Sequence, residues 1–161
     1  MSRGVVLCLD CARVTGWCVG APGERPHYGS VTFRGVSHGA VYAGFVDWVE
    51  DAIRLHQPSQ IVVEAPLHRG GHMGQDAALL ALGFLAHLEL LCHDHAVQLL
   101  TEHVSRTRKA VMGRGSFPKG EAKDAVMTWC RERGYEPPTH DAADAICLWL
   151  YVEQLRLGRA A

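Results

Sequence analysis

The sequence contains no apolar stretch of about 18 or more residues without a polar break, which is the length that a helix needs to cross a bilayer. We therefore expect no transmembrane helix. Only residues 1–4 precede the first apolar run, and four residues are too few for a signal peptide. Together these two absences favour a cytoplasmic protein.

The sequence also lacks the motifs of a zinc site. Cys8 and Cys11 form one C-x-x-C pair, but no second pair follows. The ten histidines include no H-x-x-x-H pair on an expected helix. We therefore interpret the six cysteines, which lie in strand-like or helix-like runs, as reduced core thiols.

Charge of one sign is not in excess, because the net charge of the chain is −1. The total therefore does not indicate nucleic-acid binding, but the distribution of charge is uneven. Between Glu102 and Lys123 there are two acidic residues and a basic block of six: Arg106, Arg108, Lys109, Arg114, Lys119 and Lys123. The basic block is either a solvated surface or a path for a polyanion, and charge alone does not choose between them.

The 161 residues, 48% of them apolar, predict one domain, 1–161, with a sizeable core. Hydrophobic periodicity and turn residues predict strands at 3–10, 15–19, 27–33, 60–64 and 97–100, and helices at 38–56, 74–94, 104–112, 121–133 and 141–157. The first three strands are typical of an antiparallel meander. The helix before the fourth strand makes that strand parallel to one of them. We therefore expect an α/β domain with a five-stranded mixed sheet flanked by helices.

The expected helix at 74–94 is apolar almost all round. From Ala77 to Cys92 its only polar side chains are His87 and Glu89. Such a helix needs cover on two sides. One side can be the sheet, and the other is either a second copy of the chain or an irregular loop.

Four carboxylates stand at the ends of these expected elements. Asp10 ends the first apolar strand and Glu64 ends the fourth, while Asp141 and Asp144 open the last helix on one face. A charge at the end of a buried strand is costly unless something pairs with it. If the four side chains meet, they form a cage for a hard cation such as Mg²⁺ or Mn²⁺.

Several motifs occur in a definite order along the chain. They are Leu9-Asp10 with Thr15-Gly16-Trp17, Val63-Glu64, Gly113-x-Gly115 with downstream lysines, and Asp141-Ala142-Ala143-Asp144-Ala145. This ordered set resembles the ribonuclease H-like nucleases, and among them the RuvC family of Holliday junction resolvases. The resemblance runs from about Val5 to about Tyr151, and the last motif is its most specific part.

The resemblance implies a ribonuclease H-like fold and a metal-dependent endonuclease that resolves four-way DNA junctions by paired phosphodiester hydrolysis. It implies that Asp10, Glu64, Asp141 and Asp144 bind Mg²⁺, for which Mn²⁺ can substitute. RuvC-like resolvases are homodimers, so the resemblance also favours a dimer through the 74–94 helix. Phage and bacterial recombination are equally natural settings.

The family carries a lysine after the glycine pair, close to the scissile phosphate. Lys119 matches that position without a gap and Lys123 matches it with an insertion, which we favour slightly. Arg108 resembles the family's basic residue before the glycines. We expect DNA contacts from the basic block together with His68 and Arg69.

The family also has an aromatic wedge in the loop that corresponds to residues 67–73, but this sequence has no phenylalanine, tyrosine or tryptophan there. Leu67, His68, His72 and Met73 are the candidates for that role. Two other residues carry open roles. Thr15 either orients Asp10 or caps the hairpin, and His140 stands beside the acids as a possible ligand.

Three other functions compete with junction resolution. One is a RuvC-like ribonuclease that processes ribosomal RNA precursors. A second is an actin-like nucleotide-binding module, because the hairpin from Asp10 to Gly16 resembles its phosphate loop; such proteins need two domains around the nucleotide. The third is a catalytically silent DNA-binding module, which four acids would disfavour because they repel DNA without metal.

Overall fold

The computed structural model describes residues 4–66 and 74–158, and its strands form one mixed sheet. The strands are β1 (Val6–Asp10), β2 (Val14–Gly20), β3 (His27–Thr32), β4 (Gln60–Glu64) and β5 (Gln98–Glu102), in the spatial order β3-β2-β1-β4-β5. The helices are α1 (His38–His56), α2 (Gln75–Asp94), α3 (Val104–Met112), α4 (Ala122–Glu132) and α5 (His140–Arg156).

The pairing of the strands confirms the expected topology. β1, β2 and β3 form an antiparallel meander, and β4 returns after α1 to lie parallel to β1. β5 extends the sheet in parallel beyond β4. Because β1 and β4 run parallel, their carboxyl ends lie at the same edge of the sheet.

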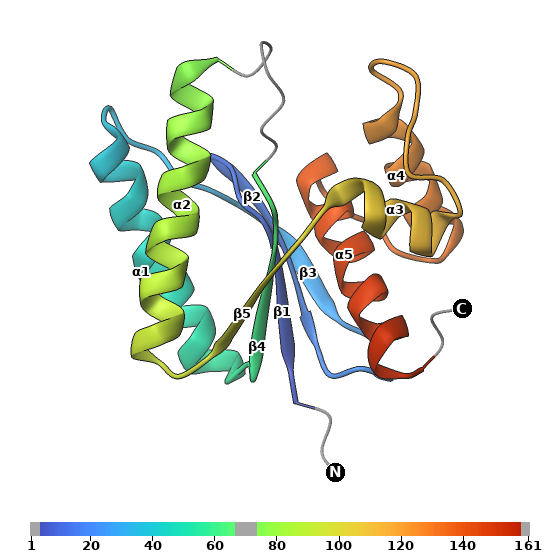
Figure 1. Ribbon diagram of the computed structural model, residues 1–161, viewed down its shortest axis with the longest axis horizontal. Helices are drawn as coiled ribbons and strands as arrows, with labels where there is room; N and C mark the ends of the chain where they lie inside the picture. Colours follow the sequence, from blue (N-terminus) through green and yellow to red (C-terminus); the bar gives the residue numbers. More distant parts are fainter. Residues whose placement is uncertain (1–3, 67–73, 159–161) are drawn as a thin grey trace.

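Helices cover both faces of the sheet, as Figure 1 shows, with α1 and α2 on one side and α3, α4 and α5 on the other. The alternating side chains of β1 divide between the two cores. Leu7 and Leu9 pack with α1 and α2, around Phe45 and Phe84. Val6 and Cys8 pack with α4 and α5, around Trp149. The central strand is thus buried on both faces, which explains why its sequence is continuously apolar.

The cysteines behave as core residues. All six thiols are free, and five of them are buried. Cys8 and Cys18 face each other in the β1–β2 ladder and lie in the same core cluster as Cys130 and Cys147. Burial raises the pKa of the Cys130 thiol to about 12, so this sulfur stays protonated and packs as an apolar group.

Some predicted boundaries differ from the structure by a few residues. The first strand begins at Val6 rather than at residue 3. The fifth strand runs to Glu102 instead of stopping at residue 100, because backbone pairing with β4 continues through its polar end. The last helix begins one residue earlier, since the Thr139 hydroxyl accepts a hydrogen bond from the Ala142 amide and caps it. Gly134, with a φ of 77°, follows the end of α4.

α2 buries only one of its faces within the chain. Leu80, Phe84, Leu88 and Leu91 are buried, whereas Leu79, Leu82 and Leu90 are 52%, 44% and 58% exposed. Among the described residues, α2 is also the one helix whose length and composition would suffice to cross a membrane. Its buried face packs on α1 and the sheet, as a core helix does, so the exposed leucines mark a surface rather than a span.

Candidate active site

The parallel register of β1 and β4 brings the first two acids together. Leu9 pairs with Val63 in the parallel ladder. The next residues along the two strands, Asp10 and Glu64, therefore lie at the same edge of the sheet. Both carboxylates are partly buried at the edge where the strands end. Desolvation, followed by the charge of Glu64, raises the pKa of Asp10, so the two side chains lie close together.

A glycine allows the last helix to reach this edge. Gly16 pairs with Asp10 in the β1–β2 ladder, and a Cβ atom at Gly16 would overlap the backbone carbonyl of Asp141. Only the absence of a side chain therefore permits α5 to start so close to β2. The Thr15 hydroxyl donates to the Ala12 carbonyl at 2.7 Å and accepts from the Ala12 amide, so it caps the hairpin.

Asp144 is the most enclosed of the four acids. It is 8% exposed, and one carboxylate oxygen accepts a hydrogen bond from Nη2 of Arg108 at 2.8 Å. The two side chains are 9% and 13% exposed, so this is a largely desolvated ion pair. Asp141 lies one helical turn earlier and is partly exposed.

Burial and mutual repulsion make the acid cluster reluctant to ionise. Desolvation and the charge of Asp144 are the main causes that raise the pKa of Glu64 to about 7. Desolvation, followed by the charges of Glu64, Asp144 and Asp141, raises the pKa of Asp10. Desolvation likewise raises the pKa of Asp144, although the Arg108 guanidinium opposes the rise. When these acids are ionised, the site holds an excess of buried negative charge, which a bound cation would neutralise.

The structure separates the two candidate lysines. Lys123, near the start of α4, is close enough for its charge to lower the pKa of Asp10, Glu64 and Asp144. Lys119 is exposed in the loop between α3 and α4. The electrostatic contact with the acids therefore comes from Lys123.

Arg106, Lys109 and Arg114 of the basic block are exposed. Arg106 and Lys109 are exposed on α3 and line an open groove with Ser105, Gly113, Gly115 and Ser116. The guanidinium of Arg114 lies 4.8 Å from the Phe117 ring centroid. His68 and Arg69, as well as the proposed wedge residues 67–73, lie outside the described residues.

His140 turns away from the acids. Its Nε2 lies 3.2 Å from Oδ1 of Asp124 on α4, and the pair is exposed. This contact joins the first turns of α4 and α5, which carry Lys123 and Asp141 respectively. His140 therefore has a structural partner and is not directed at the acid cluster in this conformation.

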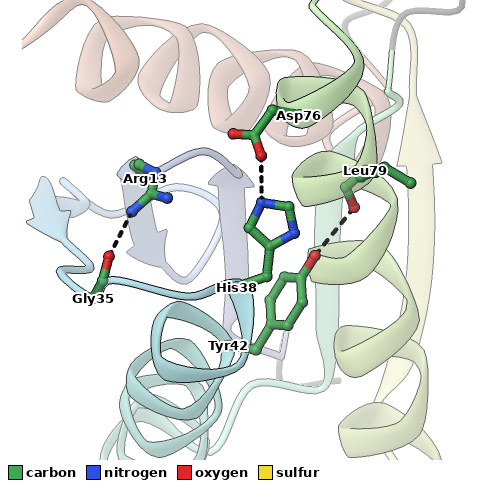
Figure 2. Close-up of polar contacts among 6 residues, drawn as sticks. All are labelled: Arg13, Gly35, His38, Tyr42, Asp76 and Leu79. Carbon is green, nitrogen blue, oxygen red and sulfur yellow. Dashed lines mark hydrogen bonds and ion pairs between the residues drawn. The ribbon is translucent and has the colours of Figure 1, made fainter.

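A cavity of about 360 Å³ opens beside the acids, between the ends of β1 and β4 and the first half of α2. Asp10 and Glu64 form one wall, and Leu80 and Phe84 form the apolar wall opposite. Figure 2 shows the polar contacts beside this cavity. His38 of α1 contacts Asp76 of α2 at 2.8 Å, and the Tyr42 hydroxyl donates to the Leu79 carbonyl at 3.1 Å.

These contacts hold α1 and α2 together near the cavity. In the same view Arg13, on the hairpin that follows Asp10, donates to the carbonyl of Gly35 at 3.4 Å. Sequence patterns did not predict this polar group, because its members are far apart in the chain. The tight fit of Tyr42 over Gly83 leaves no room for a Cβ there.

The donor set fits a divalent cation, although the side chains are not preformed around one. Four carboxylates are the hard oxygen ligands that Mg²⁺ and Mn²⁺ prefer, and the raised pKa values of Asp10, Glu64 and Asp144 reflect burial and the charges of neighbouring acids. In residues 4–66 and 74–158, however, no three potential ligands are spaced to hold an ion as they stand. One reason is visible, since Arg108 already occupies an oxygen of Asp144.

Comparison with solved structures places this fold among known proteins. A structure of Thermus thermophilus RuvC has a TM-score of 0.69 at 18% identity, covering 97% of this chain and 98% of that chain. T. thermophilus RuvC in complex with a Holliday junction substrate has a TM-score of 0.74 at 17% identity, with the same coverage. The yeast mitochondrial Holliday junction resolvase Ydc2 has a TM-score of 0.61 at 14% identity, covering 98% and 82%.

No protein-family model and no curated protein sequence matches the chain. At these low identities the likeness to solved structures is a likeness of fold, and it extends over nearly the whole chain. The five-stranded mixed sheet flanked by helices confirms the predicted architecture. The chain therefore has the ribonuclease H-like fold of the RuvC Holliday junction resolvases.

Proposed function

We propose that this protein is a divalent-metal-dependent endonuclease that resolves four-way DNA junctions. The observation that carries the proposal is the convergence of four carboxylates at one sheet edge, in a fold shared with a RuvC that is bound to a Holliday junction. A cluster of acids, together with an exposed basic groove at α3, suits a substrate whose phosphates are held by the groove and cleaved at the acids.

Asp10, Glu64, Asp141 and Asp144 would hold the metal, with Asp10 central because all three other acids act on it. When bound, divalent ions supply an activated water and stabilise the leaving oxyanion. Lys123 would stabilise negative charge that develops on the scissile phosphate, since it lies close enough to the acids to alter their ionisation. Arg106 and Lys109 would bind phosphates along the groove, and Arg114 and Lys119 would bind them from the exposed loop that follows α3.

Paired cleavage of a four-way junction needs two active sites. We propose that a homodimer supplies them through α2, whose exposed leucines form a stripe at the helical repeat. Leu79, Leu82 and Leu90 would then be covered by the same helix of a second copy. A symmetric dimer of this kind places two identical acid centres on one branched substrate.

The test is a cleavage assay on a synthetic four-way junction, with duplex DNA, flap DNA and structured RNA as competitors, in Mg²⁺ or Mn²⁺. We expect cleavage of the junction, and loss of cleavage in Asp10→Asn with the fold retained by circular dichroism. Efficient cleavage of structured RNA in preference to the junction would instead favour an RNA-processing role. Normal nicking by a folded Asp10→Asn protein would contradict the metal centre.

A further inference from the structure

Arg108 differs from every other cation of the basic block in its environment. Its neighbours on α3, Arg106 and Lys109, are exposed, whereas the Arg108 side chain is only 13% exposed. It points inward across the interface between α3 and α5 and donates from Nη2 to Asp144. Arg108 is therefore part of the acid centre rather than of the surrounding surface.

The guanidinium supplies buried positive charge to the acid centre. Arg108 faces Asp144 of α5 and acts on Glu64 of β4, while Lys123 of α4 acts on the same acids from an exposed position. Removing one partner of a buried ion pair leaves an uncompensated charge, so Arg108 stabilises the metal-free chain.

The same contact conflicts with metal binding. One Asp144 oxygen already accepts a hydrogen bond from the Arg108 guanidinium. A divalent ion bound to that oxygen would be repelled by the buried positive charge of Arg108. A cation at the acids and Arg108 in its present position therefore compete for Asp144.

A second observation shows that the Arg108 guanidinium has an unused hydrogen-bond donor. Nε of Arg108 is buried and has no hydrogen-bond partner among the described residues. A guanidinium binds most strongly when two of its N–H groups meet one planar or tetrahedral anion, as they do with phosphate. In its present position, one of the donors that would form that pair is unused.

We infer that Arg108 is an exchangeable internal counter-ion, which occupies the acid centre until a DNA phosphodiester takes its guanidinium and leaves Asp144 free for metal. This inference rests on the proposed function, since it concerns the same metal centre and the same polyanion. Arg106 and Lys109 of the same helix line an exposed groove, whereas Arg108 faces the acids. A DNA strand that runs from this groove to the acids would bring a phosphodiester to Arg108. Metal and DNA would then bind cooperatively, and thermodynamic linkage makes the effect reciprocal.

The first experiment needs no DNA. Binding of Mn²⁺ to the full-length protein is measured by calorimetry and electron paramagnetic resonance for wild type, Arg108→Met and Arg108→Lys. Methionine removes the charge and keeps the length of the side chain, whereas lysine keeps the charge. We expect Arg108→Met to bind Mn²⁺ at least about tenfold more tightly than wild type, and Arg108→Lys to stay near wild type.

The matched control is Arg54→Met. Arg54 also contacts an aspartate at 2.8 Å, but that pair is exposed on α1, away from the acids. Its substitution should leave Mn²⁺ affinity unchanged. An unchanged or weaker affinity in Arg108→Met would overturn the inference, because Arg108 would then support the metal site instead of competing with it.

The second experiment measures coupling. The affinity for a four-way junction is measured by fluorescence anisotropy in Ca²⁺ and in EDTA. The ratio of the affinity in Ca²⁺ to the affinity in EDTA gives the coupling between metal and DNA. Direct contacts between metal and phosphate contribute equally in both proteins. We therefore expect a ratio several-fold smaller in Arg108→Met than in wild type, whereas equal ratios would overturn the exchange.

The two experiments also separate this inference from the proposed function. If wild type neither binds nor cleaves junctions while Arg108→Met still binds Mn²⁺ more tightly, the proposed substrate is wrong and the competition at Asp144 stands. If junctions are cleaved and Mn²⁺ affinity does not change, the proposed function stands and the counter-ion role is wrong. If Arg108→Met does not fold, the wild-type coupling ratio and the Mn²⁺ affinity of Arg108→Lys decide the question. A wild-type ratio near one, or an altered Mn²⁺ affinity in Arg108→Lys, would overturn the inference.

Discussion

The charge on Glu64 should destabilise the metal-free protein, and replacing Glu64 with glutamine should remove that cost. Burial and the charge of Asp144 raise the pKa of Glu64 from 4.5 to about 7. A tenfold change in a protonation equilibrium corresponds to about 1.4 kcal/mol, so ionising Glu64 in the folded chain costs about 3 kcal/mol. Neutral glutamine has nearly the same shape and carries no charge.

The sign of the pH dependence follows from the raised pKa. The folded chain binds the proton more tightly than the unfolded chain does, so the stability from the neutral carboxyl is complete below 4.5 and is lost as the pH rises through about 7. In EDTA, Glu64→Gln should exceed wild type in stability by about 3 kcal/mol at pH 8, but by only about 1 kcal/mol at pH 5. For a domain of this size, 3 kcal/mol corresponds to about 6–12 °C in Tm.

The assay is thermal unfolding by circular dichroism at the two pH values, in EDTA and in Mg²⁺. Saturating Mg²⁺ should reverse the order at pH 8, because the metal stabilises wild type and finds a poorer ligand in the variant. Asp47→Asn, which removes an exposed acid on α1, is the control and should have little effect in EDTA. An equal gain at both pH values, or no gain at pH 8, would refute the electrostatic reasoning.

Three further predictions concern packing, assembly and DNA contact. Gly16→Ala should displace α5 from β2, destabilise the fold by about 1–3 kcal/mol and abolish cleavage. Gly39→Ala on α1 would make only an ordinary contact with Ser37 and should be tolerated, so equal melting temperatures for both variants would contradict the close approach. Leu82→Glu should convert a dimer into a monomer in analytical ultracentrifugation, while Leu55→Glu, which replaces another exposed leucine, should not; a monomeric wild type would show that α2 has no partner copy. Lys109→Ala should reduce the slope of log junction affinity against log salt by about one, and an unchanged slope would place the DNA path elsewhere.

The sequence by itself was sufficient for the architecture of this protein. Apolar runs of strand length and the periodic spacing of α1 predicted the order of elements, and the helix between β3 and β4 predicted that β4 runs parallel to one strand of the meander, which the structure shows to be β1. These features depend on neighbours along the chain, which a sequence displays directly. Asp10 and Glu64 could be predicted as site residues for the same reason, since a carboxylate directly at the end of an apolar strand is unusual and costly to bury.

Element ends were less predictable where the deciding contact is not local. The apolar pattern of β5 ends at Leu100, yet the strand continues to Glu102 because β4 supplies backbone partners. The apolar composition of α2 predicted cover on two sides, and within the chain only one side receives it. Neither outcome can be read from the segment alone.

The tertiary structure decided which charges meet. In sequence, Arg108 is one of six similar cations, and only its resemblance to the family's basic residue before the glycines distinguishes it from Lys109. Packing of α3 on α5 turns Arg108 onto Asp144 and leaves Lys109 in solvent. Gly16 acquires its role in the same way, through the approach of Asp141 from a distant part of the chain. Charge and steric effects act through space over a few ångströms, so the electrostatic balance of the acid centre exists only after the helices have packed on the sheet.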